Sequence, residues 1–354
     1  MKAAINYGPG DVRIEQISEP LPPGPDEVCL RVLTASMCGT DAGQYQVPSM
    51  IPLEVSHPAS GHQGPLILGH EVCGIVEAKG EAVSHLAVGD RVAIGAGSWC
   101  GECPRCLEGR MNICEHYFVY GLHANGGLAE RARFPAKMCV RVPAQCSDEA
   151  AALAQPLAVA LHALARSQIR SEMTVAVFGV GGIGSLVLAA LAVQPHLRPA
   201  RLLAVDIDPA RLQQASLLGA DAAINAELSD VHQQVDHITH GEGVDMAIEA
   251  TGQPATIAQA LRTIHHGGRL LQVGIPREPV ALPIAELVLQ EKEVIASNGH
   301  ICPLDMPAAL NLLATTDLAT RVGITLISLE TLVAEGLLPL VEHRAHKKAV
   351  VRIN

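Results

Sequence analysis

The chain of 354 residues is poor in aromatic side chains, with only three Phe, four Tyr and one Trp. We therefore expect an aliphatic core. No stretch of about eighteen apolar residues runs without small or polar interruption, so no membrane span is expected. The first residues, MKAAINYGPGDVRIE, lack the charged and then apolar layout of a signal peptide, and there are no internal repeats or low-complexity linkers.

Basic residues are also in the minority. The formal net charge is −11, from 25 Lys and Arg against 36 Asp and Glu. Such a chain is not attracted to nucleic acid or to an anionic membrane surface, so neither is expected as a partner. The ten cysteines indicate metal binding or buried thiols in a reducing cytoplasm rather than disulfides. The length allows two domains, each with its own core.

A glycine-rich turn stands between a predicted strand and a predicted helix. Residues 175–178 (VAVF) are typical of a buried parallel strand, and Gly179, Gly181 and Gly184 follow in the pattern G-x-G-x-x-G. The residues after the turn have the apolar spacing of a helix. Here the glycines allow a tight turn, a close approach of the backbone to a pyrophosphate, and close packing of helix on strand.

Asp206 follows the next predicted strand, 201–205. A carboxylate at this position can accept hydrogen bonds from both ribose hydroxyls of an adenosine and repels a 2′-phosphate. Because no arginine is expected nearby to offset that repulsion, the pattern favours NAD over NADP. A glycine turn in an unrelated βαβ unit is the alternative, and the position of Asp206 weakens it.

The character of the sequence changes along the chain. Residues 1–150 alternate Gly/Pro loops with short β-like runs, namely 2–6, 27–34, 71–78, 91–94 and 128–134. A helical stretch, 148–167, leads into alternating helices, such as 209–218 and 254–265, and strands, namely 175–178, 201–205, 222–225, 244–249, 269–273 and 293–297. Six strands with right-handed crossovers predict a doubly wound parallel sheet. The tail, KKAVVRIN, is β-like and is expected to return to the first domain.

Four cysteines, Cys100, Cys103, Cys106 and Cys114, have the spacing C-x2-C-x2-C-x7-C. Four thiolates so close together can surround one tetrahedral zinc ion, and an iron–sulfur cluster is the alternative. Two-residue gaps seldom allow good disulfide geometry. With all four coordination positions filled by the protein, a zinc ion here would be structural.

Three further motifs contain metal-ligating residue types: Cys38 in MCGTD, His70 and Glu71 in ILGHE, and Gln155 in LAQPLAVALHA. Cysteine, histidine and carboxylate suit a zinc ion that keeps one position open for substrate. Taken singly, each residue is better explained without a metal, as a buried thiol, a core histidine, a solvated glutamate or a capping glutamine. Only their combination indicates a site.

Together these motifs resemble the zinc-dependent medium-chain alcohol dehydrogenases. The resemblance covers essentially the whole chain, from KAA…GDVR through CGTD, GHE, the cysteine lobe and GVGGIG to the ExTG of 249–252. It is greatest for the (R,R)-2,3-butanediol dehydrogenases, through the insertion IPLEVSHPASGHQGPLILGHE, the NGG of 125–127 and the segment EAAALAQPLAVALHA. Sorbitol and threonine dehydrogenases are close relatives of that subgroup.

The resemblance implies an α/β protein of two domains. A β-rich, GroES-like catalytic domain would comprise 1–153 and 297–354, with the structural zinc lobe near 100–114. A Rossmann domain that binds NAD would comprise 154–296, and the active site is expected between the two. The implied cofactors are NAD and two zinc ions per chain, one catalytic and one structural. A homo-oligomer, dimer or tetramer, is expected in the cytoplasm.

The resemblance also implies roles for individual residues. A catalytic zinc would be held by Cys38 and His70, with Glu71 and Gln155 competing for the remaining place. Thr40 matches the hydroxyl that relays the substrate proton, and Asp41 matches a residue behind the metal ligands. The positions that match the cofactor site are Ile183, Asp206 and Arg211, beside pyrophosphate, ribose and adenine, and Val273, Gly274 and Ile275, near the nicotinamide.

Two positions depart from the family pattern. Gln155 stands where glutamate is usual, and Ala42 and Gly43 stand where a relay histidine is usual; His57 and His62 are candidates to replace it. The implied activity is the reversible NAD-linked oxidation of a small secondary alcohol or vicinal diol to the ketone. The alternatives are polyol or L-threonine dehydrogenation and, outside catalysis, a dinucleotide-binding protein whose metal site has degenerated.

Overall fold

The computed structural model describes residues 1–46 and 52–353. The chain divides into two compact units, one of Met1–Ala158 with His300–Asn354 and one of Val159–Gly299. The sequence places these boundaries at 153/154 and 296/297. In the described part of the chain, no helix combines the length and apolar character that crossing a bilayer requires.

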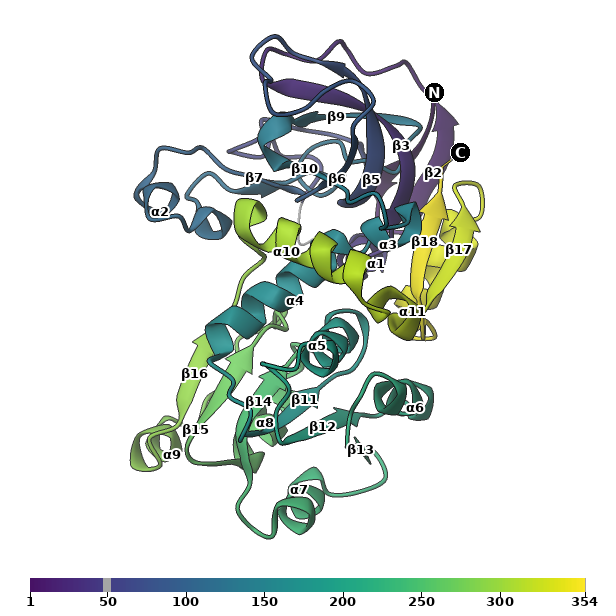
Figure 1. The fold of residues 1–354 in the computed structure, drawn as a ribbon. Coiled ribbons are helices and arrows are strands. Elements are labelled where there is room, and N and C mark those ends of the chain that lie inside the picture. Colours follow the sequence, from purple (N-terminus) through teal and green to yellow (C-terminus); the bar gives the residue numbers. More distant parts are fainter. Residues whose placement is uncertain (47–51, 354) are drawn as a thin grey trace. The chain divides into compact units, whose positions relative to one another are not determined.

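The unit 159–299 is built on six parallel strands in the order β13-β12-β11-β14-β15-β16 (Figure 1). The strands are β11 (Thr174–Phe178), β12 (Arg201–Asp206), β13 (Ala222–Asn225), β14 (Val244–Glu249), β15 (Ile264–Gln272) and β16 (Glu293–Ala296). The helices between them are α5 (Gly182–Val193), α6 (Pro209–Leu217), α7 (Val231–Thr239), α8 (Pro254–Thr263) and α9 (Ile284–Leu289). This order is that of dinucleotide-binding folds, and the predicted doubly wound sheet is confirmed.

The core of this unit is aliphatic, as expected from the scarcity of aromatic residues. Val175, Ala176 and Val177 in β11 are fully buried, and so are most residues of β12 and β14. Phe178 is the one aromatic side chain in the buried cluster that these strands form with α7 and α8. Burial of both faces explains why these strands are continuous apolar runs rather than alternating ones.

The junction of α8 and β15 differs from the prediction of a helix over 254–265 and a strand over 269–273. The helix ends at Thr263 and the strand begins at Ile264. Ile264 pairs with Val244, but Arg269 pairs with Met246, so the register shifts between them. Gly267 has a φ of +76°, and a Cβ on Gly268 would lie 2.4 Å from the Ile264 side chain. The two glycines thus accommodate an irregular strand where their sequence predicts a break.

The other unit contains two main sheets. One has the order β10-β6-β5-β3-β18-β17, with β9 also paired to β3, and the other has the order β2-β1-β4. The strands are β1 (Lys2–Gly8), β2 (Asp11–Gln16), β3 (Glu27–Ser36), β4 (Leu66–Ile67), β5 (Glu71–Lys79), β6 (Arg91–Ile94), β7 (Gly97–Ser98), β8 (Phe118–Val119), β9 (Arg131–Pro135), β10 (Cys139–Arg141), β17 (Ile324–Ser328) and β18 (Lys348–Arg352). Strand β18 lies antiparallel beside β3, which confirms that the tail returns to this unit.

The helices of this unit are α1 (Gly39–Gln46), α2 (Pro104–Leu107), η1 (Met111–Ile113), η2 (Ala136–Met138), α3 (Asp148–Ala151), α10 (Cys302–Thr315), α11 (Leu318–Val322), η3 (Leu332–Leu337) and α12 (Leu338–Val341). Helix α4 (Ala154–Ser167) begins in this unit and continues into the other. The predicted single helix over 148–167 is therefore two helices, α3 and α4. Pro156 has no N–H for the carbonyl of Ala152, which accepts a hydrogen bond from the Ser36 hydroxyl instead, at 3.1 Å.

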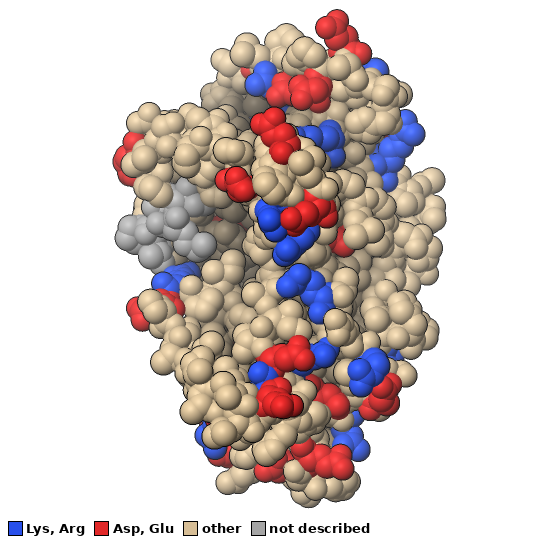
Figure 2. Space-filling model, turned by 90° about the vertical axis from the view of Figure 1, so that its left-hand side faces the viewer, with Lys and Arg blue, Asp and Glu red and all other residues tan. Residues whose placement is uncertain are grey.

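One face of the molecule carries charged side chains of both signs. On the face drawn in Figure 2, acidic and basic side chains lie interspersed among uncharged ones. The described residues of this face therefore offer no continuous basic surface of the kind that binds a nucleic acid backbone.

Candidate functional site: two metal centres and a dinucleotide turn

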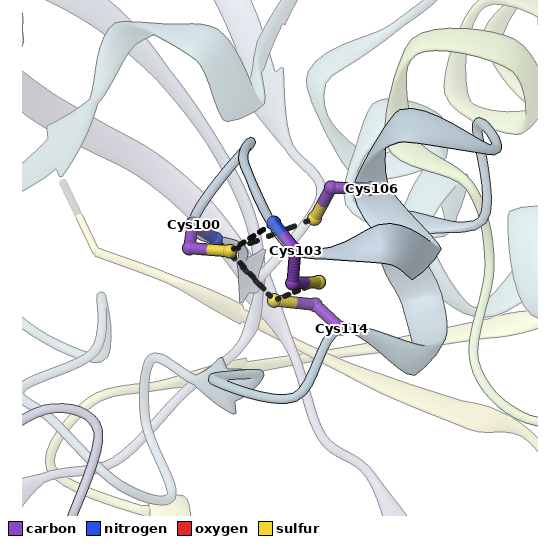
Figure 3. Close-up of side chains that lie close together, drawn as sticks. All are labelled: Cys100, Cys103, Cys106 and Cys114. Carbon is purple, nitrogen blue, oxygen red and sulfur yellow. Dashed lines mark hydrogen bonds between the residues drawn. The ribbon is translucent and has the colours of Figure 1, made fainter.

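The cysteine lobe brings four thiols to one point (Figure 3). The Sγ atoms of Cys100 and Cys106 lie 3.9 Å apart, those of Cys103 and Cys114 3.8 Å, and those of Cys100 and Cys114 3.5 Å. Four sulfurs bound to one zinc at about 2.3 Å lie about 3.8 Å apart in a tetrahedron. An iron–sulfur cluster distributes its cysteines over two or more irons. The geometry therefore fits a single tetrahedral ion.

The surroundings of the lobe suit thiolates held in a closed site. Backbone N–H groups of Glu115 and Cys106 lower the pKa of the Cys103 thiol to about 6, whereas burial raises that of Cys106 to about 12. Trp99, Met111 and Tyr117 pack against the cluster. All ten cysteines lie within the described residues, and none forms a disulfide.

A second cluster joins Cys38, His70 and Glu71, whose ligating atoms lie within 4.8 Å of one another. The antiparallel register of β3 and β5 pairs Ser36 with Glu71. The chain continues from Ser36 to Cys38 and precedes Glu71 with His70, so the pairing brings thiol and imidazole to the same end of the sheet. His70 is 4% exposed and Glu71 is fully buried, whereas Cys38 is half-buried.

Two side chains of α1 contact this cluster. The Thr40 hydroxyl lies 3.4 Å from Cys38 Sγ. Asp41, fully buried, accepts the backbone N–H of Cys38 at 2.9 Å and lies 3.5 Å from His70 Nδ1. Burial lowers the pKa of His70, but Asp41 and the Cys38 thiol raise it more, so the net pKa is well above its usual value. Neither Asp41 Oδ1 nor His70 Nδ1 has a hydrogen-bond partner among the described residues, so the carboxylate faces the imidazole as a close charged neighbour.

Two further residues, Lys348 and Ser36, contact the cluster, and neither was predicted from the sequence. The Lys348 ammonium lies 2.9 Å and 2.7 Å from the two oxygens of Glu71, and the Ser36 hydroxyl donates to the same carboxylate. Burial lowers the pKa of Lys348, but the negative charge of Glu71 and Cys38 outweighs this, so the net pKa is raised. Lys348 is 277 residues from Glu71 in the sequence, so no local pattern could predict the pair.

Three other predicted positions are not joined to the cluster by a hydrogen bond between described residues. Gln155 is half-buried in the first turn of α4, and among the described residues no hydrogen bond joins it to Cys38, His70 or Glu71. The ring of His57 stacks on His123 at 4.3 Å, and His62 Nε2 lies 3.2 Å from the Gly64 carbonyl oxygen. His57 thus packs on the loop that follows β8 and His62 contacts its own loop, and neither makes a hydrogen bond to Thr40 among the described residues.

The glycine turn in the other unit has the geometry that its sequence predicts. Gly179 has a φ of +81°, and a Cβ on Gly184 would lie 1.8 Å from the Gly179 carbonyl oxygen. Asp206 ends β12, and its carboxylate accepts the N–H of Val180 at 2.8 Å. The carboxylate therefore lies at the turn, as required for contact with a ribose. Ile183 occupies the first turn of α5.

The expectation that no arginine lies near this turn is wrong. Arg211 Nη1 is 3.5 Å from the place that a Cβ on Gly181 would take, and its Nε is 3.8 Å from Asp208. The guanidinium reaches the turn because α6 begins directly after Asp206 and Asp208. Val273 and Gly274 are half-buried, and Ile275 is 68% exposed, so this turn has a solvent-facing side.

Both units of the chain match known protein families. Residues 24–144 match the alcohol dehydrogenase GroES-like domain, and residues 182–315 match the zinc-binding dehydrogenase domain. The chain belongs to the zinc-dependent medium-chain alcohol dehydrogenases. It is therefore an oxidoreductase of the zinc-type alcohol and polyol dehydrogenases, as the resemblance of its motifs implied.

Individual relatives of this dehydrogenase differ in substrate. A sorbitol dehydrogenase of Bacillus subtilis is 33% identical over 78% of this chain and 76% of its own length. The crystal structure of 2R,3R-butanediol dehydrogenase from the same species is 31% identical, with a TM-score of 0.89 over 100% of this chain and 99% of that one. An Escherichia coli alcohol dehydrogenase complexed with NADH is 26% identical, with a TM-score of 0.87 over 100% and 99%.

Proposed function

We propose that the protein catalyses the reversible oxidation of a small secondary alcohol or vicinal diol to the ketone, with NAD as hydride acceptor. The convergence of Cys38, His70 and Glu71 within 4.8 Å carries this proposal. A mixed sulfur, nitrogen and oxygen set with fewer than four protein ligands is typical of a zinc site that admits substrate. When bound, zinc lowers the pKa of the alcohol oxygen, and NAD accepts the hydride.

The chain's own residues have distinct roles in this proposal. Cys38 and His70 hold the ion, and Asp41 orients His70. Thr40, beside the Cys38 sulfur, accepts the hydroxyl proton of the substrate and passes it toward solvent. Glu71 is shared between the site and Lys348, which leaves the remaining ligand place to Gln155 or to Glu71 released from the lysine.

The site is tested by a pair of cysteine variants. Cys38→Ser removes a ligand, whereas Cys29→Ser changes a half-buried thiol on the same segment that lies in neither metal cluster. Formation of NADH should be measured with 2,3-butanediol stereoisomers, sorbitol and L-threonine. We expect turnover of a diol by the wild type and by Cys29→Ser, and none by Cys38→Ser. Equal activity of both variants would contradict the assignment.

Polyol oxidation is the second candidate, because a sorbitol dehydrogenase is among the relatives. The two functions differ in substrate length. A kcat/KM for sorbitol at least about tenfold above that for every butanediol isomer would favour the polyol, since this ratio corresponds to about 1.4 kcal/mol of transition-state binding.

We propose that the enzyme prefers NAD to NADP, because the Asp206 carboxylate repels a 2′-phosphate. Arg211 beside Gly181 offers a compensating charge to a 2′-phosphate, so the preference is expected to be finite rather than absolute. Asp206→Ser should narrow the NAD/NADP ratio of kcat/KM, and Arg211→Met in the wild-type background should widen it. Equal use of both cofactors by the wild type would contradict the proposal.

A homo-oligomer in the cytoplasm is also proposed. The outer strand β16 carries the 41% exposed Val294, and the preceding α9 exposes Val288 and Leu289. Such an edge presents unpaired backbone groups and apolar side chains to a second copy. The ten free thiols support a reducing compartment. Light scattering should give a multiple of 37.2 kDa, reduced by Val294→Lys; a monomeric wild type would exclude the oligomer.

A further inference from the structure

Glu249 is a fully buried carboxylate at the carboxyl end of β14. Its oxygens accept the N–H groups of Thr251 at 2.8 Å and Gly252 at 3.0 Å, and the Thr251 hydroxyl also donates to it. Its main-chain carbonyl accepts the N–H groups of Val273 and Gly274, each at 2.9 Å. One residue therefore holds two backbone turns, 250–252 and 273–275.

Gln272, the last residue of β15, completes this arrangement. Its amide nitrogen donates to Glu249 Oε2 and to the Gly274 carbonyl oxygen, both at 2.6 Å. Its Oε1 is buried and has no hydrogen-bond partner among the described residues. Because both neighbours are acceptors, the nitrogen must face them. The unpaired, buried oxygen of Gln272 costs free energy. The same side chain supplies two N–H donors that no apolar residue could supply.

The two turns are packed too closely to move independently. A Cβ on Gly274 would lie 2.2 Å from Gly252 N, and a Cβ on Gly252 would lie 2.5 Å from the Ile275 carbonyl oxygen. The turn 250–252 also packs against the glycine turn of β11, because a Cβ on Gly179 would lie 2.3 Å from the Thr251 side chain. Gln272 and Glu249 thus fix the turn 273–275 relative to the turn that faces the pyrophosphate.

We propose that Gln272 is a positioning residue for the nicotinamide half of the dinucleotide, acting through its hydrogen bonds to Gly274 and Glu249. The inference rests on the proposed NAD-linked function, in which the turn 273–275 lies beside the nicotinamide. The adenosine half depends on Asp206 and the glycine turn, neither of which contacts Gln272 through the hydrogen bonds described. Loss of the amide should therefore weaken binding of the nicotinamide end and spare the adenosine end.

The test uses the full-length, zinc-loaded protein and two probes, NADH and ADP-ribose, which lacks the nicotinamide. Gln272→Met keeps the side-chain length and removes both donors, whereas Gln272→Lys keeps N–H donors. Gln168→Asn is the control, since it breaks a hydrogen bond between Gln168 and Arg269 of the same strand, away from the turn. Affinities are measured by titration, with thermal midpoints to confirm folding.

We expect Gln272→Met to raise the Kd for NADH about tenfold, the equivalent of one net hydrogen bond, and to change that for ADP-ribose less than twofold. Gln272→Lys should recover most of the NADH affinity, and the control should match the wild type. The kcat of Gln272→Met with saturating NAD should also fall, because the ring is misplaced rather than merely weakly bound.

Three results would overturn the inference. Equal weakening of NADH and ADP-ribose would assign Gln272 a structural role only. Equal loss in the methionine and lysine variants would show that shape, not hydrogen-bond donation, matters. A wild type that binds neither probe would contradict the NAD-linked function itself, which separates that failure from the other two.

Discussion

The cysteine lobe and the Cys38–His70–Glu71 cluster lie in the same unit of the chain but are built in different ways. The lobe takes four identical ligands from fifteen consecutive residues, 100–114, and packs them against apolar side chains. The other cluster takes three different ligands from two strand ends and surrounds them with charged groups, Asp41 and Lys348. A closed, uniform ligand set suits a structural ion, and a mixed, incomplete set suits a reactive one.

The comparison also shows how differently the two centres depend on the fold. The lobe is a local loop, so its ligand spacing alone predicts the geometry. The mixed cluster exists only when β3, β5 and β18 pair correctly, because its residues are otherwise far apart. Damage to the lobe should therefore appear first in stability, and damage to the mixed cluster first in turnover.

Cys38→Ser is expected to have the largest effect on activity. Loss of a ligand should lower kcat by more than about 100-fold. Mutation of a residue that only hydrogen-bonds a ligand usually lowers activity by up to about 100-fold. The midpoint of thermal unfolding should stay within about 2 °C of the wild type. An active Cys38→Ser protein with its zinc retained would mean that the reactive centre lies elsewhere.

Cys103→Ser should show the opposite behaviour. Removing one thiolate leaves the four-sulfur site incomplete, and the binding energy of the ion contributes directly to folding. The midpoint of thermal unfolding should fall by at least about 5 °C, at about 2–4 °C per kcal/mol for a unit of about 150–250 residues. If this variant keeps the wild-type midpoint and loses only turnover, the roles of the two centres are reversed.

Lys348→Met tests the charged surroundings of the mixed cluster. It leaves the buried Glu71 carboxylate without its cation, which should cost about 3 kcal/mol in the free energy of unfolding. The double variant Lys348→Met/Glu71→Gln removes both charges and should recover much of that loss in a double-mutant cycle. Additive losses would show that the two residues do not interact in solution.

The smallest expected effect lies where the ring of His123 packs against that of His57. Burial, and then His57, lower the pKa of His123 to about 4, below its usual 6.5. The unfolded chain therefore takes up a proton first, so stability is highest above pH 7 and falls as the pH drops from about 6.5 toward 4. His123→Gln should therefore reduce the difference in unfolding free energy between pH 7 and pH 5 by about 1 kcal/mol. This value is small because the ring is partly exposed and solvent screens its charge.

The measurement is urea unfolding at both pH values, with the zinc content checked at each. The same pH dependence in wild type and His123→Gln would show that other groups control acid stability. Neither metal centre should be affected, since His123 lies in neither cluster.

The parallel sheet was predictable because most of its strands are short apolar runs bounded by turn residues; for 222–225 and 244–249 the predicted and observed bounds agree. The two clusters of candidate metal ligands were predictable because their residue types are chemically distinctive. The break at Pro156 was missed because it depends on Ser36, which replaces the missing donor from a different strand. The start of β15 was missed because glycines normally end strands.

Long-range partners were beyond the sequence for a related reason. Lys348 and Gln272 each lie in an ordinary β-like run. The neighbouring sequence does not indicate that each contacts a buried carboxylate, Glu71 and Glu249 respectively. Arg211 was named as a cofactor residue, but its approach to Gly181 follows only from the start of α6. Such roles become visible when the strand order brings the partners together.

The most direct test of the two-centre account is the X-ray absorption spectrum of zinc in Cys38→Ser, combined with the zinc content of each variant. The wild type should hold two zinc ions per chain, and Cys38→Ser should hold one. The remaining ion should show only sulfur neighbours, at about 2.3 Å. A single zinc in the wild type, or nitrogen and oxygen neighbours around the ion left in Cys38→Ser, would contradict the assignment of a closed structural centre and an open reactive one.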